Sequence, residues 1–294
     1  MHANHLIVLV LVAACGSSST PKPDAAQNGF TPPAAPLTAY DNSGTMPVMV
    51  DADFTSCTAI GMTTVAVAVS TTVKDFQSHN AVPNAMVTAF PGVSTQQTFA
   101  TGTSDASGNL VMTIPPGTGL FGFEMTTTDG TTMPTFLLNQ SLDTDPAMTA
   151  QTISKIQSVS VATAETLPAL IGETRTPGTG VVAGALRDCQ DHELANFAAT
   201  VSSTSGTATP IDGAETYYFT PGVDLPVRNT QEPSSSADGL FMVVQLPVAQ
   251  TAYVQMWGYE DMASVGGPMK LIAELQVPVL ADTVITGDYQ PAAQ

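Results

Sequence analysis

Apolar and polar positions alternate along this chain in short runs that turn residues separate. In residues 64–70, Val65, Val67 and Val69 fall on one face, which is the pattern of a half-buried strand. Further segments with strand character are 85–89, 110–114, 120–125, 135–138, 181–187, 197–201, 217–219, 240–246, 251–258, 271–279 and 283–286. Short strands with turns at this spacing predict an all-β fold of antiparallel β-sandwiches.

The strand pattern of residues 73–116 recurs in residues 186–247. The matching positions are Asp75, Gln77 and His79 with Asp188, Gln190 and His192, then Asn84 with Asn196 and Gly108 with Gly239. Solenoid repeats have periods of about 20–50 residues, so two copies about a hundred residues apart indicate a tandem pair of whole domains. We therefore expect one β-sandwich domain over residues 48–150 and a second over residues 180–294.

Residues 151–179 form a connector between these domains. Its one helix candidate is the segment 158–172, where the apolar residues make no clean stripe and Pro168 interrupts the pattern. Proline removes a helical hydrogen bond and clashes with the preceding turn. We expect a short helix or turn packed between the two domains.

The N-terminal residues 1–15 have the pattern of a targeting segment. The apolar run 6–12 is too short to span a bilayer as a helix, but it has the length of a signal-peptide core. The sequence Val12-Ala13-Ala14-Cys15 then resembles a bacterial lipobox. The resemblance implies that Cys15 is acylated and holds the protein to a membrane.

Gly16 after the cysteine suggests the outer membrane by the rule known for enteric bacteria, which would make this an extracytoplasmic, lipid-anchored protein. The segment before the apolar run has His2 and His5 but no Lys or Arg, so either the true start lies upstream or the signal is weak. An ordinary cleaved signal peptide is the alternative. Residues 16–47 are rich in Ser, Pro, Ala, Gly and Asn, which predicts a disordered tether that holds the domains off the membrane.

The charge and composition exclude some classes of binding partner. The formal net charge is −18, with seven Lys and Arg residues in all. No basic cluster exists, so the chain lacks the electrostatic footprint of a nucleic-acid-binding protein, and it is not attracted to anionic membrane surfaces. A hydrophobic content of 43% with 11% charged residues is not the composition of a disordered protein.

Both repeats resemble the carboxypeptidase regulatory-like domain, a transthyretin-like sandwich close to the collagen-binding-protein B-type (CnaB-like) repeats. The first repeat carries Val73, Asp75, Pro83, Ala85, Val87, Ser104-Asp105 with Gly108, and Pro115-Pro116-Gly117. The second carries Leu186, Asp188, Leu194, Phe197, Asp238-Gly239-Leu240-Phe241 and Pro247. The resemblance implies transthyretin-like sandwiches and the role of an accessory or surface module, and it implies no catalysis.

Beyond Cys15, the chain has two cysteines, Cys57 and Cys189. In an oxidising compartment such a pair is a disulfide candidate, and the bond would join the start of the first domain to the first turn of the second. The alternative is two buried free thiols, because each cysteine lies beside a strand.

No catalytic or metal-binding set is recognisable. His79 and His192 lie in matching turns, and no nucleophile-elbow motif is present. The segment 188–193 is dense in ligand residue types, but Asn196 stands where a zinc-protease motif needs its second histidine. We expect a polar hairpin turn there, with no metal and no cofactor.

Related surface repeats link a lysine to an asparagine with the help of an acid. Lys74, Glu124 and Asn139 have a suitable order. However, Lys74 directly precedes Asp75, which places its side chain on the wrong face of the strand, so we expect a solvated lysine instead.

Five aromatic residues occur in the second domain, namely Tyr217, Tyr218, Tyr253, Trp257 and Tyr259. Aromatic side chains on a sandwich can stack on sugars or anchor a partner, although they also commonly supply core burial. We expect a non-enzymatic surface or envelope lipoprotein with a structural or adhesive role. The alternative is a module that binds carbohydrate or peptide with the long loop 221–236 and these aromatic residues.

Overall fold

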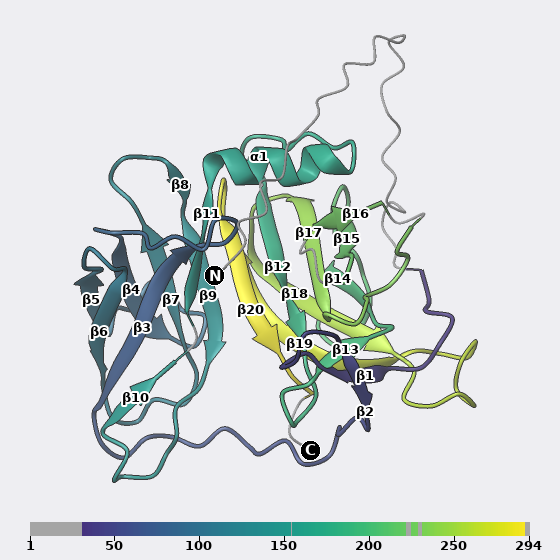
Figure 1. Cartoon of the computed structure of the whole chain (residues 1–294), viewed down its shortest axis with the longest axis horizontal. Coiled ribbons are helices and arrows are strands. Elements are labelled where there is room, and N and C mark those ends of the chain that lie inside the picture. Colours follow the sequence, from purple (N-terminus) through teal and green to yellow (C-terminus); the bar gives the residue numbers. More distant parts are fainter. Residues whose placement is uncertain (1–30, 154, 222–224, 229–230, 292–294) are drawn as a thin grey trace, which may run out of the picture.

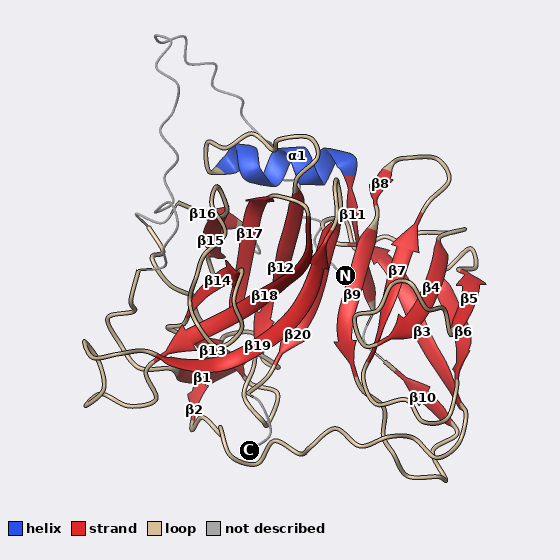
Figure 2. Cartoon of the chain, turned by 180° about the vertical axis from the view of Figure 1, so that it is seen from behind, coloured by secondary structure: helices blue, strands red, loops and turns tan. Residues whose placement is uncertain are grey.

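One sheet of nine strands runs through both halves of the molecule (Figures 1 and 2). The computed structural model describes residues 31–153, 155–221, 225–228 and 231–291. In order across the sheet the strands are β16 (Pro226–Val227), β15 (Glu215–Phe219), β17 (Leu240–Leu246), β12 (Gly180–Leu186), β20 (Val284–Tyr289), β9 (Thr135–Gln140), β7 (Phe121–Thr126), β4 (Met86–Pro91) and β5 (Ala100–Thr103). The two halves meet where β20 pairs in parallel with β9.

A second layer of strands covers each half of this sheet. In the second half it contains β14 (Ala198–Ser202), β18 (Ala249–Gly258) and β19 (Lys270–Val279). In the first half it contains β3 (Val67–Asp75), β6 (Asn109–Ile114), β8 (Thr132–Met133), β10 (Ala150–Thr152) and β11 (Ile156–Ser160). The predicted all-β sandwich class is therefore confirmed. The structure also contains four parallel pairings that the sequence did not predict. They join β10 to β3, β11 to β3, β12 to β20, and β20 to β9.

The two second layers lie on opposite faces of the nine-stranded sheet. Successive residues of a strand point to opposite faces. On β9, Phe136 and Leu138 belong to the core of the second half, whereas Leu137 belongs to the core of the first half. Both cores thus meet at one strand from its two sides, so the two sandwiches share one sheet.

The N-terminal described residues belong to the second half. Strand β1 (Thr38–Asp41) pairs with β13 (Glu193–Ala195) on one side and with β2 (Val48–Val50) on the other. Leu37 and Ala39 are buried in the core of the second half. For residues 31–47 this differs from the disordered tether expected over residues 16–47, and it differs from a first domain that begins at residue 48. The reason is that β1 gains a second partner, β13, far along the chain.

The chain then crosses from the second half to the first as a strap, residues 51–63 (Figure 1). The strap ends where the Thr63 N–H donates to the Thr118 carbonyl oxygen at 3.0 Å and the Thr63 carbonyl accepts from Gly117 N–H at 2.6 Å. The chain therefore enters the second half, leaves it for the first half, and returns at β12.

The internal repeat is reproduced at the level of single hydrogen bonds. Ser104 Oγ accepts from the Ala85 N–H at 2.9 Å, and Ser235 Oγ accepts from the Phe197 N–H at 3.0 Å. The residues before these donors, Asn84 and Asn196, both have a positive φ, as do the paired glycines Gly108 and Gly239. A Cβ at either glycine would collide with a backbone carbonyl oxygen, that of Val73 or of Leu186, so both turns require glycine.

The segment 158–172, predicted as the connector's helix candidate, contains the end of a strand and then a helix. Strand β11 joins the first half, and α1 (Val161–Leu170) follows it directly. Ser160 caps the helix, since its Oγ accepts from the Thr163 N–H at 3.0 Å, which satisfies an otherwise unpaired donor. Pro168 lies in the last turn. Within the described part of the chain, no helix is both long and apolar enough to cross a membrane.

Gly184 should be the glycine most sensitive to substitution in the nine-stranded sheet. Its Cβ position would collide with the Gly287 carbonyl oxygen of the neighbouring strand β20 and would lie 2.7 Å from the Tyr289 ring. We expect Gly184→Ala to lower the free energy of unfolding by roughly 2–3 kcal/mol, as overpacking against backbone does, measured by urea denaturation. Gly44→Ala is the control, because its nearest atom is 3.7 Å away. Equal stabilities of the two variants would contradict this packing.

Candidate functional site

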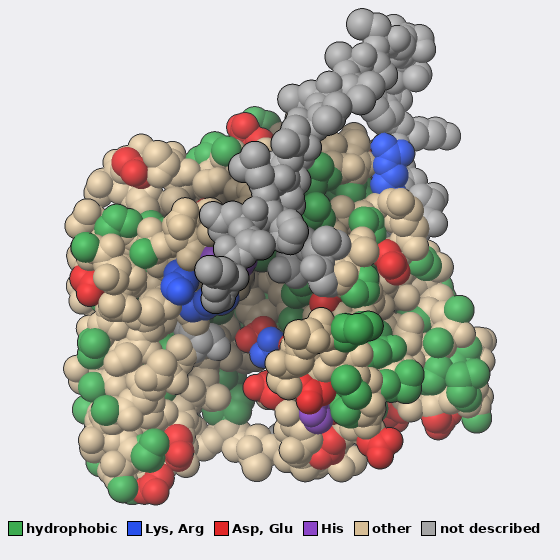
Figure 3. All heavy atoms as spheres, in the orientation of Figure 1, with side chains coloured by type: hydrophobic (Ala, Val, Ile, Leu, Met, Phe, Trp, Pro, Cys, Tyr) green, Lys and Arg blue, Asp and Glu red, His purple; other side chains and the backbone are tan. Residues whose placement is uncertain are grey.

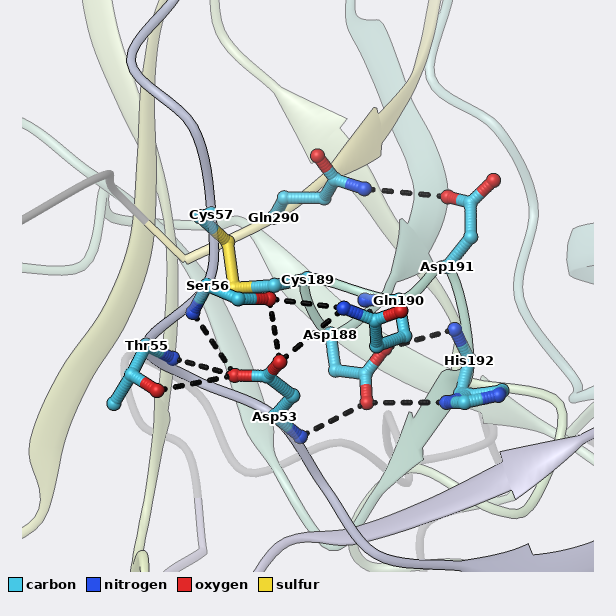
Figure 4. The surroundings of a disulfide bond; sticks show 10 residues. All are labelled: Asp53, Thr55, Ser56, Cys57, Asp188, Cys189, Gln190, Asp191, His192 and Gln290. Atoms are coloured by element: carbon cyan, nitrogen blue, oxygen red, sulfur yellow. Dashed lines mark hydrogen bonds and ion pairs between the residues drawn. A yellow bond between two sulfur atoms is a disulfide. The ribbon is translucent and has the colours of Figure 1, made fainter.

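A disulfide joins the strap to the first turn of the second half (Figure 4). Cys57 and Cys189 have Cα atoms 4.7 Å apart and are separated by 132 residues in sequence. Cys189 lies in the polar segment 188–193, which we call the disulfide turn. The structure thus pairs the two cysteines that the sequence nominated, and it does so across the two predicted domains.

A buried carboxylate organises the disulfide turn. Asp188 is fully buried, and its carboxylate accepts from the N–H groups of Asp53 at 3.0 Å, Gln190 at 2.9 Å and His192 at 2.9 Å. His192 Nδ1 lies 3.2 Å from the same carboxylate. Because a buried carboxylate needs partners, these bonds fix the turn and the strap together.

Polar contacts extend this network along the strap. Asp53 Oδ1 accepts from Thr55 N–H at 2.8 Å and from Ser56 N–H at 3.0 Å. Hydrogen bonds hold the pKa of Asp53 well below its usual range, and the bond from the Ser56 side chain contributes most. Gln190 Nε2 donates to Ser56 Oγ at 2.9 Å. Within the described residues, no group of three or more His, Cys, Asp or Glu side chains is placed to hold a metal ion. This arrangement fixes the chain path.

Three of the five nominated aromatic residues are buried. The exposed fractions of Tyr217, Tyr218 and Tyr259 are 0%, 2% and 2%. Tyr217 and Tyr218 are consecutive on β15 and point into different cores. The prediction of an aromatic binding surface is therefore wrong for these three residues, because both faces of β15 and the start of the loop after β18 are covered.

Their hydroxyl groups also have internal partners. Tyr217 donates to Glu215 at 2.8 Å, Tyr218 accepts from the Ala199 N–H at 2.9 Å, and Tyr259 donates to the Gly267 carbonyl at 3.1 Å. Tyr253 and Trp257 are half-buried on β18. The loop 221–236 is described in part, and its Ser235 and Ser236 are buried. Cys15, the predicted lipidation site, lies outside the described residues.

Lys74, Glu124 and Asn139 do not meet. Val73 belongs to the core of the first half, and so do Phe123 and Met125. Lys74 and Glu124 therefore point away from that core on opposite outer faces. Asn139 Nδ2 instead donates to the Asp288 carbonyl at 3.1 Å. The expectation of an unlinked lysine agrees with this placement.

A cleft of about 410 Å³ opens between the two halves, and Figure 3 shows a hollow there with charged side chains close to it. Its floor is the face of the nine-stranded sheet that the first half leaves uncovered. Small residues of the parallel strands, Ala183, Gly184 and Ala185 on β12 with Thr286 and Gly287 on β20, form the centre of this floor. The wall on the side of the first half includes Phe76 and Gln157. This volume is in the range of small-molecule sites.

The two ends of the cleft differ in chemistry. Under α1 the lining is apolar, with Ala164 and Leu167 of the helix facing Val181 and Val284 of the sheet. At the carboxyl ends of β12 and β20 the lining residues are Arg187 and Asp288, and Lys155 lies at the start of β11. Burial raises the pKa of Asp288, and the nearby Arg187 opposes that shift.

The residues of this cleft were not among the predicted sites. Its one local signal is the run Ala183-Gly184-Ala185 inside a strand, since small residues in a strand mark a site that something approaches closely. The opposing strand β20 lies about a hundred residues later, so the pairing that forms the floor leaves no local pattern.

No protein-family model matches the sequence, and no curated protein matches it. Among solved structures, the TIE protein of Bacillus anthracis is similar with a TM-score of 0.27 and 11% identity; the match covers 90% of this chain and 48% of that one, so this chain spans about half of its length. The shaft pilin SpaA of Lactobacillus rhamnosus GG has a TM-score of 0.24 and 11% identity over 79% of this chain and 98% of that one. A streptococcal ancillary pilin has a TM-score of 0.22 and 16% identity, and the match covers 79% of this chain and 64% of that one. TM-scores this low do not establish a common fold and carry no argument about this chain.

Asp188 should contribute much more to stability than its counterpart in the first repeat. Asp188→Ala leaves three backbone donors near a buried site without their acceptor, and we expect it to lower the free energy of unfolding by roughly 2–4 kcal/mol. Asp75→Ala is the matched control, because Asp75 makes its bonds to Ser78 at an exposed turn and should cost about 1 kcal/mol or less. Chemical denaturation measures both, and similar losses would contradict the role given to Asp188.

Proposed function

We propose that this chain is a non-enzymatic protein of the bacterial envelope or cell surface, with a structural or adhesive role, held to the membrane by an acylated Cys15. The disulfide between Cys57 and Cys189 carries this proposal. Disulfides persist in oxidising compartments outside the cytoplasm and are rare inside it. The signal-like segment before Cys15 points to the same location.

A mechanical role suits the way in which the halves are connected. A single sheet passes through both halves, and the strap joins them a second time through the disulfide. The connecting strands therefore cannot separate without breaking backbone hydrogen bonds between β9 and β20. Such a body transmits load between its ends instead of hinging at a linker.

The alternative role, carbohydrate or peptide binding through aromatic residues of the second half, loses most of its support. Tyr217, Tyr218 and Tyr259 are buried with satisfied hydroxyl groups. Tyr253 and Trp257 alone keep part of their surface exposed. We therefore do not propose this role.

Intact mass of the protein purified from membranes tests the proposal. We expect a chain that begins at Cys15 and carries acyl groups, and we expect reduction to add two hydrogens. The variant Cys15→Ser should lose the acyl mass and leave the membrane fraction. Retention of Met1 without any acyl group would overturn the location.

The disulfide has its own test. Cys57→Ser should lower the free energy of unfolding by about 2–4 kcal/mol, because the bond closes a long loop. Cys189→Ser and the double variant should show the same loss, since each removes the same bond. Additive losses from the two single variants would mean that the thiols are not joined in the native protein.

A further inference from the structure

The cleft between the halves has the form of a slot that runs along the parallel strands. The paired positions Val181 with Val284, Ala183 with Thr286, and Ala185 with Asp288 form successive steps along its floor, and all belong to its lining. From the first step to the last, the floor changes from apolar to charged. A ligand that lies along the slot should therefore be apolar at one end and polar or charged at the other.

The apolar end is built for a narrow hydrocarbon. Leu167 and Pro168 of α1 form its roof, and Phe219 and Met242 close its second-half side. The floor residues Ala183 and Ala185 are short, which leaves the width of the slot free. Burial of an alkyl chain in such a site favours binding, because apolar surface is removed from water.

The charged end of the cleft has two cationic side chains, Lys155 and Arg187, which differ in their surroundings. The Lys155 side chain is exposed and makes no ion pair with a described residue. Arg187 bonds to Glu193 at 3.1 Å and reaches Asp288 and Asp191 only at 3.7 Å and 3.9 Å. Its Nε is buried without a hydrogen-bond partner among the described residues. A buried donor without an acceptor is costly, so the hydrogen-bonding capacity of the Arg187 head group is not fully used within the described residues.

We propose that this cleft binds a single unbranched hydrocarbon chain with a terminal carboxylate, the chain under α1 and the carboxylate between Lys155 and Arg187. The inference goes beyond the proposed structural role and does not depend on it. Asp288 is the one carboxylate in the cleft lining. It repels an anionic head group, and Glu193 and Asp191 also lie beside Arg187. Lys155 is therefore the cation at this end that has no carboxylate partner among the described residues, and it carries most of the attraction.

Dodecanoate is the probe, titrated by calorimetry below its micelle concentration into the full chain carrying Cys15→Ser, which needs no detergent. Dodecyltrimethylammonium has the same chain and the opposite head charge, and butyrate has the same head and a short chain. We expect dodecanoate to bind at least about tenfold more tightly than either. Equal binding of the two dodecyl compounds would overturn the recognition of the carboxylate.

Variants of the charged end should act in opposite directions. Lys155→Gln should weaken dodecanoate binding about three- to tenfold, in line with one exposed charge contact, whereas Asp288→Asn should strengthen it. Lys270→Gln is the matched control, since Lys270 pairs with Glu260 on the exposed end of β19 and should change nothing. Loss of affinity in Asp288→Asn, or equal loss in both lysine variants, would contradict the placement of the head group.

Filling the slot tests the position of the chain. Ala183→Phe should abolish dodecanoate binding, and Thr286→Leu should weaken it, with unfolding curves recorded to show that both variants fold. Val111→Phe is the control for an added ring, because Val111 is 64% exposed on β6. Undiminished binding in a folded Ala183→Phe would overturn the site.

A free fatty acid and the acyl chain of a membrane lipid share this chemistry. Solvent extraction of the purified protein, followed by mass spectrometry, separates the two sources. A carboxylic acid that is present in the parent and absent from Ala183→Phe supports the free acid, and an intact phospholipid with the same dependence supports the membrane lipid. Absence of both, together with no dodecanoate binding, would refute the proposal.

Discussion

The parallel pairing of β9 with β20 is the contact on which the rest of the structure depends. It joins Thr135 to Val284 and Leu138 to Gly287, and in doing so it turns two sandwiches into one sheet. Because alternate residues of β9 face different cores, the same strand closes both halves. Each core therefore relies on the geometry of the other.

This shared sheet also explains where the cleft lies. A second layer covers one face in the first half and the opposite face in the second half. The remaining face of β12 and β20 is then open to one side, where α1 covers only part of it. Small residues such as Ala183 and Ala185 deepen the space that remains, and the charged residues Arg187 and Asp288 lie at the strand ends. The cleft is a consequence of offset packing.

Local pattern was enough to predict much of this fold. The alternation of Leu110, Met112 and Ile114 predicted β6, and the repeat of Asn84 and Gly108 at Asn196 and Gly239 predicted two related turns that the structure reproduces in detail. These features depend on neighbours in the chain. Side-chain alternation and positive-φ turns are properties of a few consecutive residues.

Features that depend on distant partners were not predictable. The pairing of β1 with β13 and of β9 with β20 carries no local signature, because a strand pattern does not name its neighbour. The same limit explains the aromatic residues. Tyr217 and Tyr218 were expected in a strand as candidates for a binding surface or for the core, and layers on both sides of that strand bury them. The disulfide could be named as a candidate from the sequence, because Cys57 and Cys189 are the two cysteines beyond Cys15, although two free thiols remained the alternative until the structure showed the bond.

The path of the N-terminal segment has a consequence for biosynthesis. Asn196 donates its side-chain Nδ2 to the Pro36 carbonyl across 160 residues, and β1 completes its sheet only with β13. One edge of β1 can pair with β2 soon after synthesis, whereas its other edge stays unpaired until β13 is available. Long-range pairing of this kind is slow to form, so the sheet of β13, β1 and β2 is completed late in folding. The order of the strands therefore delays completion of the second half until residues 193–195 have been synthesised.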